Sequence, residues 1–255
     1  MYTDVVDLRE FYGSSLGLVA QRMIRRRTRL LWPDLRGQVV LGVGFATPYL
    51  TQFRDEAERV LAVMPARQGV MHWPASGPGQ VALVEETELP LPDMSVDRVL
   101  LVHDLEVTEN LRGLMREIWR VLDGGGRLLA VAPNRRGIWA RVDRTPFGHG
   151  HPYSTSQLSR MLRDNQFVPE QVARALYIPP TRSRFLLKSA TAWERVGSRL
   201  FDRFAGVVMI EASKQLYQIA AARRQVRRRP MLIPLGGATA RAADAASMTV
   251  SRPSD

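Results

Sequence analysis

Short apolar runs alternate with a helical pattern along the first half of the chain, and this alternation restricts the possible folds more than any other feature. Apolar runs begin near residues 39, 59, 80, 97 and 127. Each is short enough for a buried strand. Between the last two, residues 111–122 place apolar side chains on one face of a helix. Strands that alternate with helices indicate a parallel sheet in an α/β protein.

Arginine accounts for an unusual positive charge. The formal net charge is +11, and only Lys188 and Lys214 among the 36 basic residues are lysines. Two arginine clusters lie at residues 22–29 and 223–229. We predict an N-terminal amphipathic helical segment over residues 1–35, one domain over 36–220, and an Arg-rich tail over 221–255 that we expect to be disordered. The clusters leave RNA, a protein partner or a membrane open as partners.

Several classes of protein are excluded or disfavoured by what the sequence lacks. The chain has no cysteine, which excludes disulfides, thiolate metal sites and cysteine nucleophiles. No run reaches eighteen apolar residues without a charge, so we expect no integral membrane segment and a cytoplasmic protein. His149 and His151 are close in sequence but have no evident third ligand, so we predict no metal site.

A glycine-bearing turn follows the first apolar run. It contains Gly42 and Gly44 and leads into Thr47 and Pro48. A strand, a glycine turn and a helix together form a common ligand site, because the backbone approaches closely and the helix N-terminus presents free N–H groups. The same pattern also occurs as a plain connection between a strand and a helix.

Farther along, the chain contains Leu89-Pro90-Leu91-Pro92-Asp93, Ser95-Val96-Asp97, a helix over 117–122 and Gly124-Gly125-Gly126. In their order and spacing these motifs resemble those of class I S-adenosylmethionine-dependent methyltransferases of the small-molecule type. The resemblance covers about residues 36–214. It implies a three-layer, Rossmann-like α/β sandwich with a mostly parallel seven-stranded sheet, an antiparallel last strand and helices on both faces. It also implies methyl transfer from S-adenosylmethionine to a small or medium substrate.

The resemblance also assigns positions to the cofactor, and this chain departs from several of them. Gly42 stands at the position of the first motif's acid, and Ala46 and Pro48 stand at two of its glycines. No carboxylate follows the second apolar run, where the family holds the ribose and this chain has Met64. The implied cofactor-binding candidates are Gly42, Gly44, Ala46, Met64, Glu85 as the adenine acid, Glu86, and His103 at the boundary with the substrate.

The loop from Asn134 to Tyr153 is long and polar, so we expect it to cover the ligand edge of the sheet. Its arginines predict an electropositive entrance and an anionic substrate. The substrate-side candidates are Arg135, Arg136, His149, His151 and Tyr153. Methyl transfer needs little acid–base help, because the sulfonium is already activated and positioning is the main task. His103 and Tyr153 are the only catalytic candidates.

The altered cofactor motif supports a second hypothesis of a different class. A chain that keeps structural motifs but has lost the first acid, two glycines and the ribose acid fits a catalytically inactive, methyltransferase-like binding or regulatory protein. A site where adenine lies beside Glu85 would favour the enzyme. A site filled by Met64, Phe45 or Tyr49 would favour the binding protein.

Overall fold

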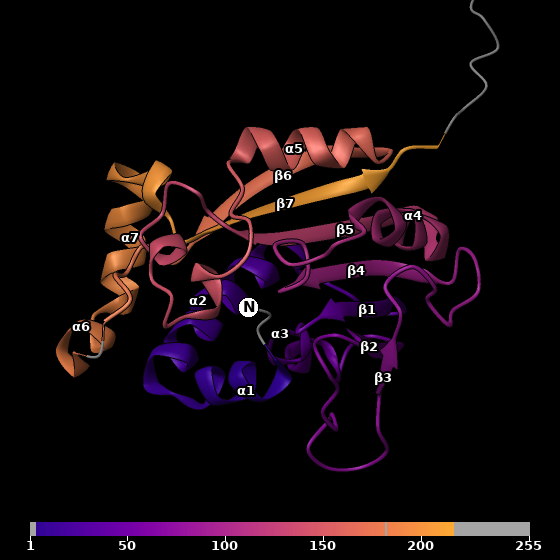
Figure 1. Ribbon diagram of the computed structural model, residues 1–255, viewed down its shortest axis with the longest axis horizontal. Helices are drawn as coiled ribbons and strands as arrows, with labels where there is room; N and C mark the ends of the chain where they lie inside the picture. The colour runs from indigo at the N-terminus through magenta and orange to yellow at the C-terminus, as the bar shows by residue number, and fades with distance from the viewer. Residues whose placement is uncertain (1–3, 182, 217–255) are drawn as a thin grey trace, which may run out of the picture. The chain divides into compact units, whose positions relative to one another are not determined.

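The sheet of this protein has seven strands in the order β3-β2-β1-β4-β5-β7-β6 (Figure 1). It is seen in a computed structural model that describes residues 4–181 and 183–216. Only β7 runs antiparallel to its neighbours β5 and β6. The predicted α/β fold with an antiparallel last strand is therefore confirmed. The strands are β1 Val39–Gly44, β2 Arg59–Pro65, β3 Val81–Val84, β4 Val96–Val102, β5 Leu122–Pro133, β6 Phe167–Ala175 and β7 Val207–Lys214.

Helices cover both faces of the sheet, because alternate strand residues point to opposite sides. Val40 and Leu100 face one core, which contains side chains of α1, α2, α3, α6 and α7. Leu41 and Leu101 face the other core, which contains side chains of α4 and α5. The helices are α1 Val5–Gly13, α2 Ser15–Leu31, α3 Thr47–Leu50, α4 Leu111–Val121, α5 Thr155–Asp164, α6 Arg184–Lys188 and α7 Ala190–Leu200, with 3-10 turns η1 Thr51–Phe53, η2 Trp139–Arg141, η3 Pro146–Gly148 and η4 Asp202–Phe204.

The N-terminal segment belongs to the same compact unit as the sheet. Leu8 of α1 and Ile24 of α2 are fully buried in the first core. Just past α2, the Trp32 indole N–H donates to Glu211 Oε1 of β7 at 2.8 Å, and both side chains are buried. The arginine-bearing α2 thus buries one face and forms part of the core of the fold.

The glycine run 124–126 lies within β5, whereas the sequence pattern predicted that it would separate the helix from the strand. The α4 helix ends at Val121 and β5 begins at Leu122. Leu122 pairs with Val96 of β4 before the register shifts, and pairing resumes at Arg127. Glycine is tolerated in such a bulge because it adopts the required backbone without steric cost.

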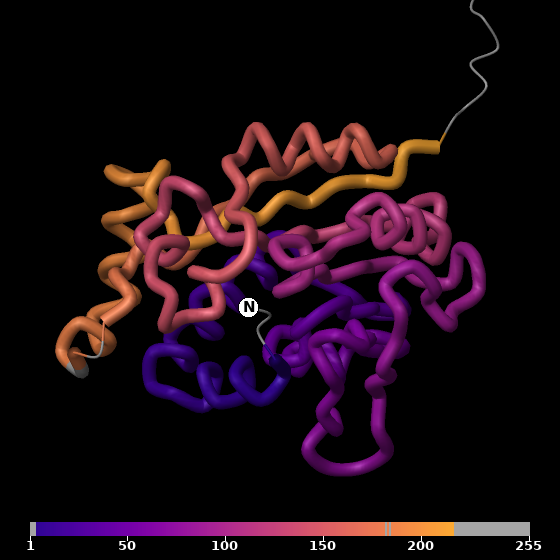
Figure 2. The backbone as a smooth tube through the Cα atoms, viewed as in Figure 1, coloured from indigo at the N-terminus to yellow at the C-terminus, as the bar shows by residue number. Residues whose placement is uncertain are grey.

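The connections that follow β1 and β2 contain less helix than the alternation of strands and helices in the sequence predicts. The α3 helix after β1 has four residues. The connection between β2 and β3, residues 66–80, contains no helix and extends as a long loop (Figure 2). Within the described residues, no helix is long and apolar enough to cross a membrane. The predicted disordered tail, residues 221–255, lies outside the described residues.

Candidate functional site

The carboxyl ends of β1 and β4 meet where the strand order reverses, which is the usual ligand position in open α/β sheets. A tight turn closes the end of β1. Gly44 has φ +75°, and a Cβ there would lie 2.3 Å from the Val102 carbonyl oxygen of β4. The next residue, Phe45, donates its N–H to the same oxygen at 2.9 Å. Only glycine fits this position, and the turn directs Phe45 across the sheet edge.

An aromatic cluster occupies this edge. We use the term for Tyr12, Phe45, Tyr49, His103 and Phe147, which come from α1, the β1 turn, α3, the end of β4 and η3. The Tyr12 ring stacks on Phe45 with centroids 5.6 Å apart and an interplanar angle of 18°. The His103 and Phe147 rings are 4.9 Å apart. All five side chains are buried.

Hydrogen bonds fix the centre of the aromatic cluster. The Tyr12 hydroxyl lies 2.5 Å from the Tyr49 hydroxyl and 2.6 Å from His103 Nε2. His103 Nδ1 lies 3.1 Å from Glu106 Oε1. The Glu106 carboxylate accepts from His103 Nδ1, and the donor in each of the other two contacts depends on the His103 tautomer. Burial raises the pKa of the Tyr12 and Tyr49 hydroxyls, so both stay protonated.

A charged cluster of Arg67, Glu86 and Asp104 lies beside the aromatic cluster. The Arg67 guanidinium pairs with Glu86, and it lies 3.2 Å from Asp104 Oδ1. Asp104 is fully buried, and burial raises the pKa of its carboxyl to about 7 although the Arg67 charge opposes the shift. Gln68 donates its side-chain amide to the His103 carbonyl oxygen at 2.9 Å and so connects the β2–β3 loop to the end of β4.

The two positions at which the resemblance expects a carboxylate are filled by the chain itself. A Cβ on Gly42 would lie 2.5 Å from Leu50 Cδ1 and 2.7 Å from the Ala46 side chain. An acid therefore has no room at Gly42 unless α3 moves. Met64 is fully buried in the core beneath the edge. Neither position offers a carboxylate to a ribose or an ammonium group.

The two acids after β3 point in different directions. Glu85 is exposed, and its backbone forms an isolated antiparallel bridge with Glu88. Glu86 is half-buried, accepts from the Thr108 hydroxyl at 2.6 Å and pairs with Arg67. Of these two cofactor candidates, only Glu86 belongs to the charged cluster.

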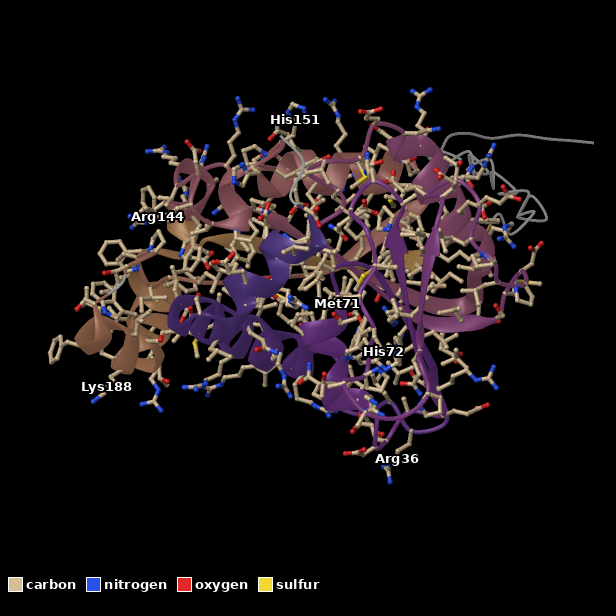
Figure 3. All side chains as sticks on the ribbon, turned by 60° about the horizontal axis from the view of Figure 1, so that its bottom comes forward. Arg36, Met71, His72, Arg144, His151 and Lys188 are labelled. Atoms are coloured by element: carbon tan, nitrogen blue, oxygen red, sulfur yellow. The ribbon has the colours of Figure 1, made fainter. Side chains whose placement is uncertain are left out.

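The structure brings one substrate-side candidate to the site. The Tyr153 hydroxyl donates to the Leu105 carbonyl oxygen at 3.3 Å, and burial raises the pKa of this half-buried phenol. The His151 backbone N–H donates to Glu106, but its side chain is exposed and lies at the outer surface in Figure 3. His149 is half-buried, and the side chains of Arg135 and Arg136 are exposed. The described residues contain no group of three or more histidine or acidic side chains placed to hold a metal ion.

Sequence reasoning missed Tyr12 and Arg67, which the structure places at the centre of the two clusters. The pattern of α1 marks Tyr12 as an apolar-face residue beside Leu8, and nothing in it points to His103, 91 residues away. Arg67 had one available signal, since it follows the strand end where the resemblance expects the ribose acid. A cation after β2, where the resemblance expects a carboxylate for the ribose, indicates that the end of this strand does not bind a ribose in the usual way.

Comparisons with known proteins agree with the fold. A family model described as "Methyltransferase domain" matches residues 38–130. No curated protein matches the chain. A chain of the complex between the Haloferax volcanii Trm112 methyltransferase activator and a methyltransferase is similar with a TM-score of 0.57 and 16% identity, over 82% of this chain and 98% of that chain.

Two further solved structures are similar over most of both chains. An S-adenosylmethionine-dependent methyltransferase from Mesorhizobium loti gives a TM-score of 0.53 at 15% identity, over 80% of this chain and 100% of that chain. The [4+2]-cyclase SpnF gives a TM-score of 0.51 at 19% identity, over 75% of this chain and 82% of that chain. With the strand order, these likenesses show a class I methyltransferase-like fold.

Proposed function

We propose that this class I methyltransferase-like chain is a binding or regulatory protein whose cofactor position is closed by its own side chains. The observation that carries the proposal is the Tyr12 hydroxyl, which lies within 2.6 Å of both Tyr49 and His103 at the carboxyl edge of β1 and β4. The resemblance implies that the methionine part of S-adenosylmethionine would lie against the β1 turn. In this chain the ring of Tyr12 lies against Phe45 of that turn.

Two energetic terms oppose cofactor binding. Gly42 and Met64 replace carboxylates, and each lost charged hydrogen bond weakens binding by about 1.5–3 kcal/mol. Two such losses correspond to roughly 10²–10⁴ in Kd. The cofactor would also have to displace buried aromatic rings from a packed core, which costs further free energy. Together these terms move an ordinary micromolar site to millimolar affinity or weaker.

The fold itself permits a function other than methyl transfer. The similar SpnF structure carries the name of a [4+2]-cyclase, and function resides in the site rather than the fold. The similar Haloferax chain comes from a complex with an activator protein. A protein partner, or RNA bound through the arginine clusters, is consistent with a binding role for this chain.

A second candidate function is S-adenosylmethionine-dependent methyl transfer, with α1 moving away from the sheet edge. The hydrogen-bonded series Glu106, His103 and Tyr12 favours it. A carboxylate that orients an imidazole prepares its Nε2 to accept a proton. If Tyr12 left, Nε2 would be free for an acceptor. Arg135 and Arg136, whose exposed side chains lie on the loop 134–153, would suit an anionic one.

Isothermal titration of the full chain with S-adenosylmethionine and S-adenosylhomocysteine tests both candidates. For the wild type we expect no binding of either ligand with a Kd below about 1 mM. A cooperative thermal unfolding transition should show that the protein tested is folded. A micromolar Kd for the wild type would refute the proposal. A gain of at least tenfold in affinity for Tyr12→Ala, relative to the wild type, would show that α1 closes a working cofactor site and would support the second candidate.

A further inference from the structure

A group of large apolar side chains is exposed on α6, α7 and η4, which follow one another along the chain; α6 and α7 lie to one side of the sheet (Figure 1). We call this group the exposed aromatic face. Single exposed apolar residues are common, but several large ones concentrated in one short segment of the chain are typical of an interaction site. Its members and exposed fractions are Phe185 81%, Trp193 37%, Val196 48%, Leu200 70%, Phe201 54% and Phe204 58%.

Contacts on the other side of α7 fix its orientation, so the apolar side chains of the exposed aromatic face on this helix point to solvent. Trp193, Val196 and Leu200 have the spacing i, i+3 and i+7, which places them on one side of the helix. A different side packs inward: a Cβ on Gly197 would lie 2.3 Å from Tyr177 Cβ. The buried Glu194 accepts the Tyr177 N–H at 2.9 Å. The apolar stripe is therefore not the core-facing side of the helix.

Cations flank the exposed aromatic face. Arg199 lies on α7 at the edge of the apolar stripe, Arg195 lies farther around the helix, and both are exposed. Lys188 ends α6 and points away from the protein in Figure 3. The exposed acid of this segment, Asp202, is paired with Arg174 at 2.5 Å. The remaining charges of the face are positive.

Phenylalanine, tryptophan and leucine beside a row of cations form the pattern of a helix that lies in the plane of a membrane interface. The apolar side chains enter the boundary between headgroups and acyl chains, and the cations meet anionic headgroups. Two copies of this chain docked face to face would bring two positively charged faces together. Nucleic acid would leave Val196 and Leu200 without apolar partners.

We propose that the exposed aromatic face docks this protein on the surface of an anionic lipid bilayer. The interaction is peripheral: α7 lies parallel to the membrane, with Leu200, Phe201 and Phe204 inserted and Lys188 and Arg199 at the level of the phosphates. It does not depend on whether the sheet edge binds a cofactor, because none of these residues belongs to the aromatic or charged cluster.

Vesicle co-sedimentation of the full chain tests the proposal. The probes are vesicles of phosphatidylcholine with 30% phosphatidylglycerol, and vesicles of phosphatidylcholine alone. We expect binding to the anionic vesicles, and at least about tenfold weaker binding for Phe185→Ser/Leu200→Ser, because these two most exposed side chains lose their buried apolar area. The variant keeps every charge, so it separates insertion from attraction by the Arg-rich C-terminal sequence.

A matched variant and a spectroscopic measurement complete the test. Leu83→Ser/Met94→Ser removes two side chains that are also more than half exposed but lie on other elements, and we expect it to bind like the wild type. Lipids brominated on their acyl chains should quench Trp193, the most exposed tryptophan, and Trp193→Phe should lose this quenching. Absence of binding to anionic vesicles would overturn the proposal. Equal binding by the wild type and Phe185→Ser/Leu200→Ser would also overturn it, as would a dimer or an RNA complex that depends on this face without vesicle binding.

Discussion

Removal of the Tyr12 hydroxyl should destabilise the protein far more than removal of a comparable hydroxyl at the surface. In Tyr12→Phe the ring still stacks on Phe45, so little volume is lost. The change leaves the Tyr49 hydroxyl and His103 Nε2, both buried, without the partner that lies within 2.6 Å of each. An unsatisfied buried polar group costs about 1–3 kcal/mol. We expect the free energy of unfolding to fall by about 2 kcal/mol.

Urea unfolding at pH 7, followed by far-ultraviolet circular dichroism, measures this change. Tyr177→Phe is the matched control, because it deletes the same atom from a half-buried tyrosine whose hydroxyl donates to the exposed Asp202 at 2.7 Å. We expect a loss of about 0.5 kcal/mol there, since water replaces the missing bond. Tyr49→Phe should show a coupling energy of about 1 kcal/mol with Tyr12→Phe in a double-mutant cycle.

Equal and small losses for Tyr12→Phe and Tyr177→Phe would refute this reasoning. Such a result would mean that water reaches the Tyr12 hydroxyl and that α1 does not close the sheet edge in solution. Zero coupling between Tyr12 and Tyr49 would contradict the hydrogen bond between them directly.

Three further changes have defined outcomes. The pKa of Asp104 is about 7 in the folded protein and about 4 when unfolded. Between these two pH values the folded state binds more protons than the unfolded state, so the folded protein loses stability as the pH rises from about 4 to about 7. Asp104→Asn should therefore gain about 2 kcal/mol of unfolding free energy relative to the wild type between pH 5 and pH 8, and a pH-independent difference in urea unfolding would contradict this. Gly42→Asp restores the first motif's acid but should lower the melting temperature without creating S-adenosylmethionine binding, because its Cβ would lie 2.5 Å from Leu50 Cδ1; micromolar binding in calorimetry would disprove it. Gly44→Ala should cost at least about 2 kcal/mol in unfolding free energy because of its φ of +75° and the nearby Val102 oxygen, and an unchanged melting curve would refute it.

The strands of the sheet were predictable from the sequence because each strand is determined by residues that are close together in the chain. Apolar runs such as 97–102 and the glycine turn at Gly44 determine strands and one connection without reference to distant residues. The glycine run 124–126 misled the prediction, since glycine is equally suited to a loop and to a bulge, and only pairing of Leu122 with Val96 decides between them.

The site was less predictable because its contacts are distant in sequence. The altered motifs indicated that Gly42 and Met64 stand where carboxylates are expected, but they did not reveal what occupies the edge. Tyr12 meets Tyr49 and His103 across 37 and 91 residues. A tyrosine on an amphipathic helix is typical of any core, so its role depends on how α1 packs against the sheet.

A crystal structure of the full chain grown with 5 mM S-adenosylhomocysteine tests the closed cofactor position most directly. We predict the Tyr12 hydroxyl within hydrogen-bonding distance of Tyr49 and His103 Nε2, Arg67 between Glu86 and Asp104, and no nucleoside density at the carboxyl ends of β1, β2 and β3. Adenine density beside Glu85 or Glu86, with Tyr12 displaced from Phe45, would contradict the closed site and establish a cofactor-binding protein.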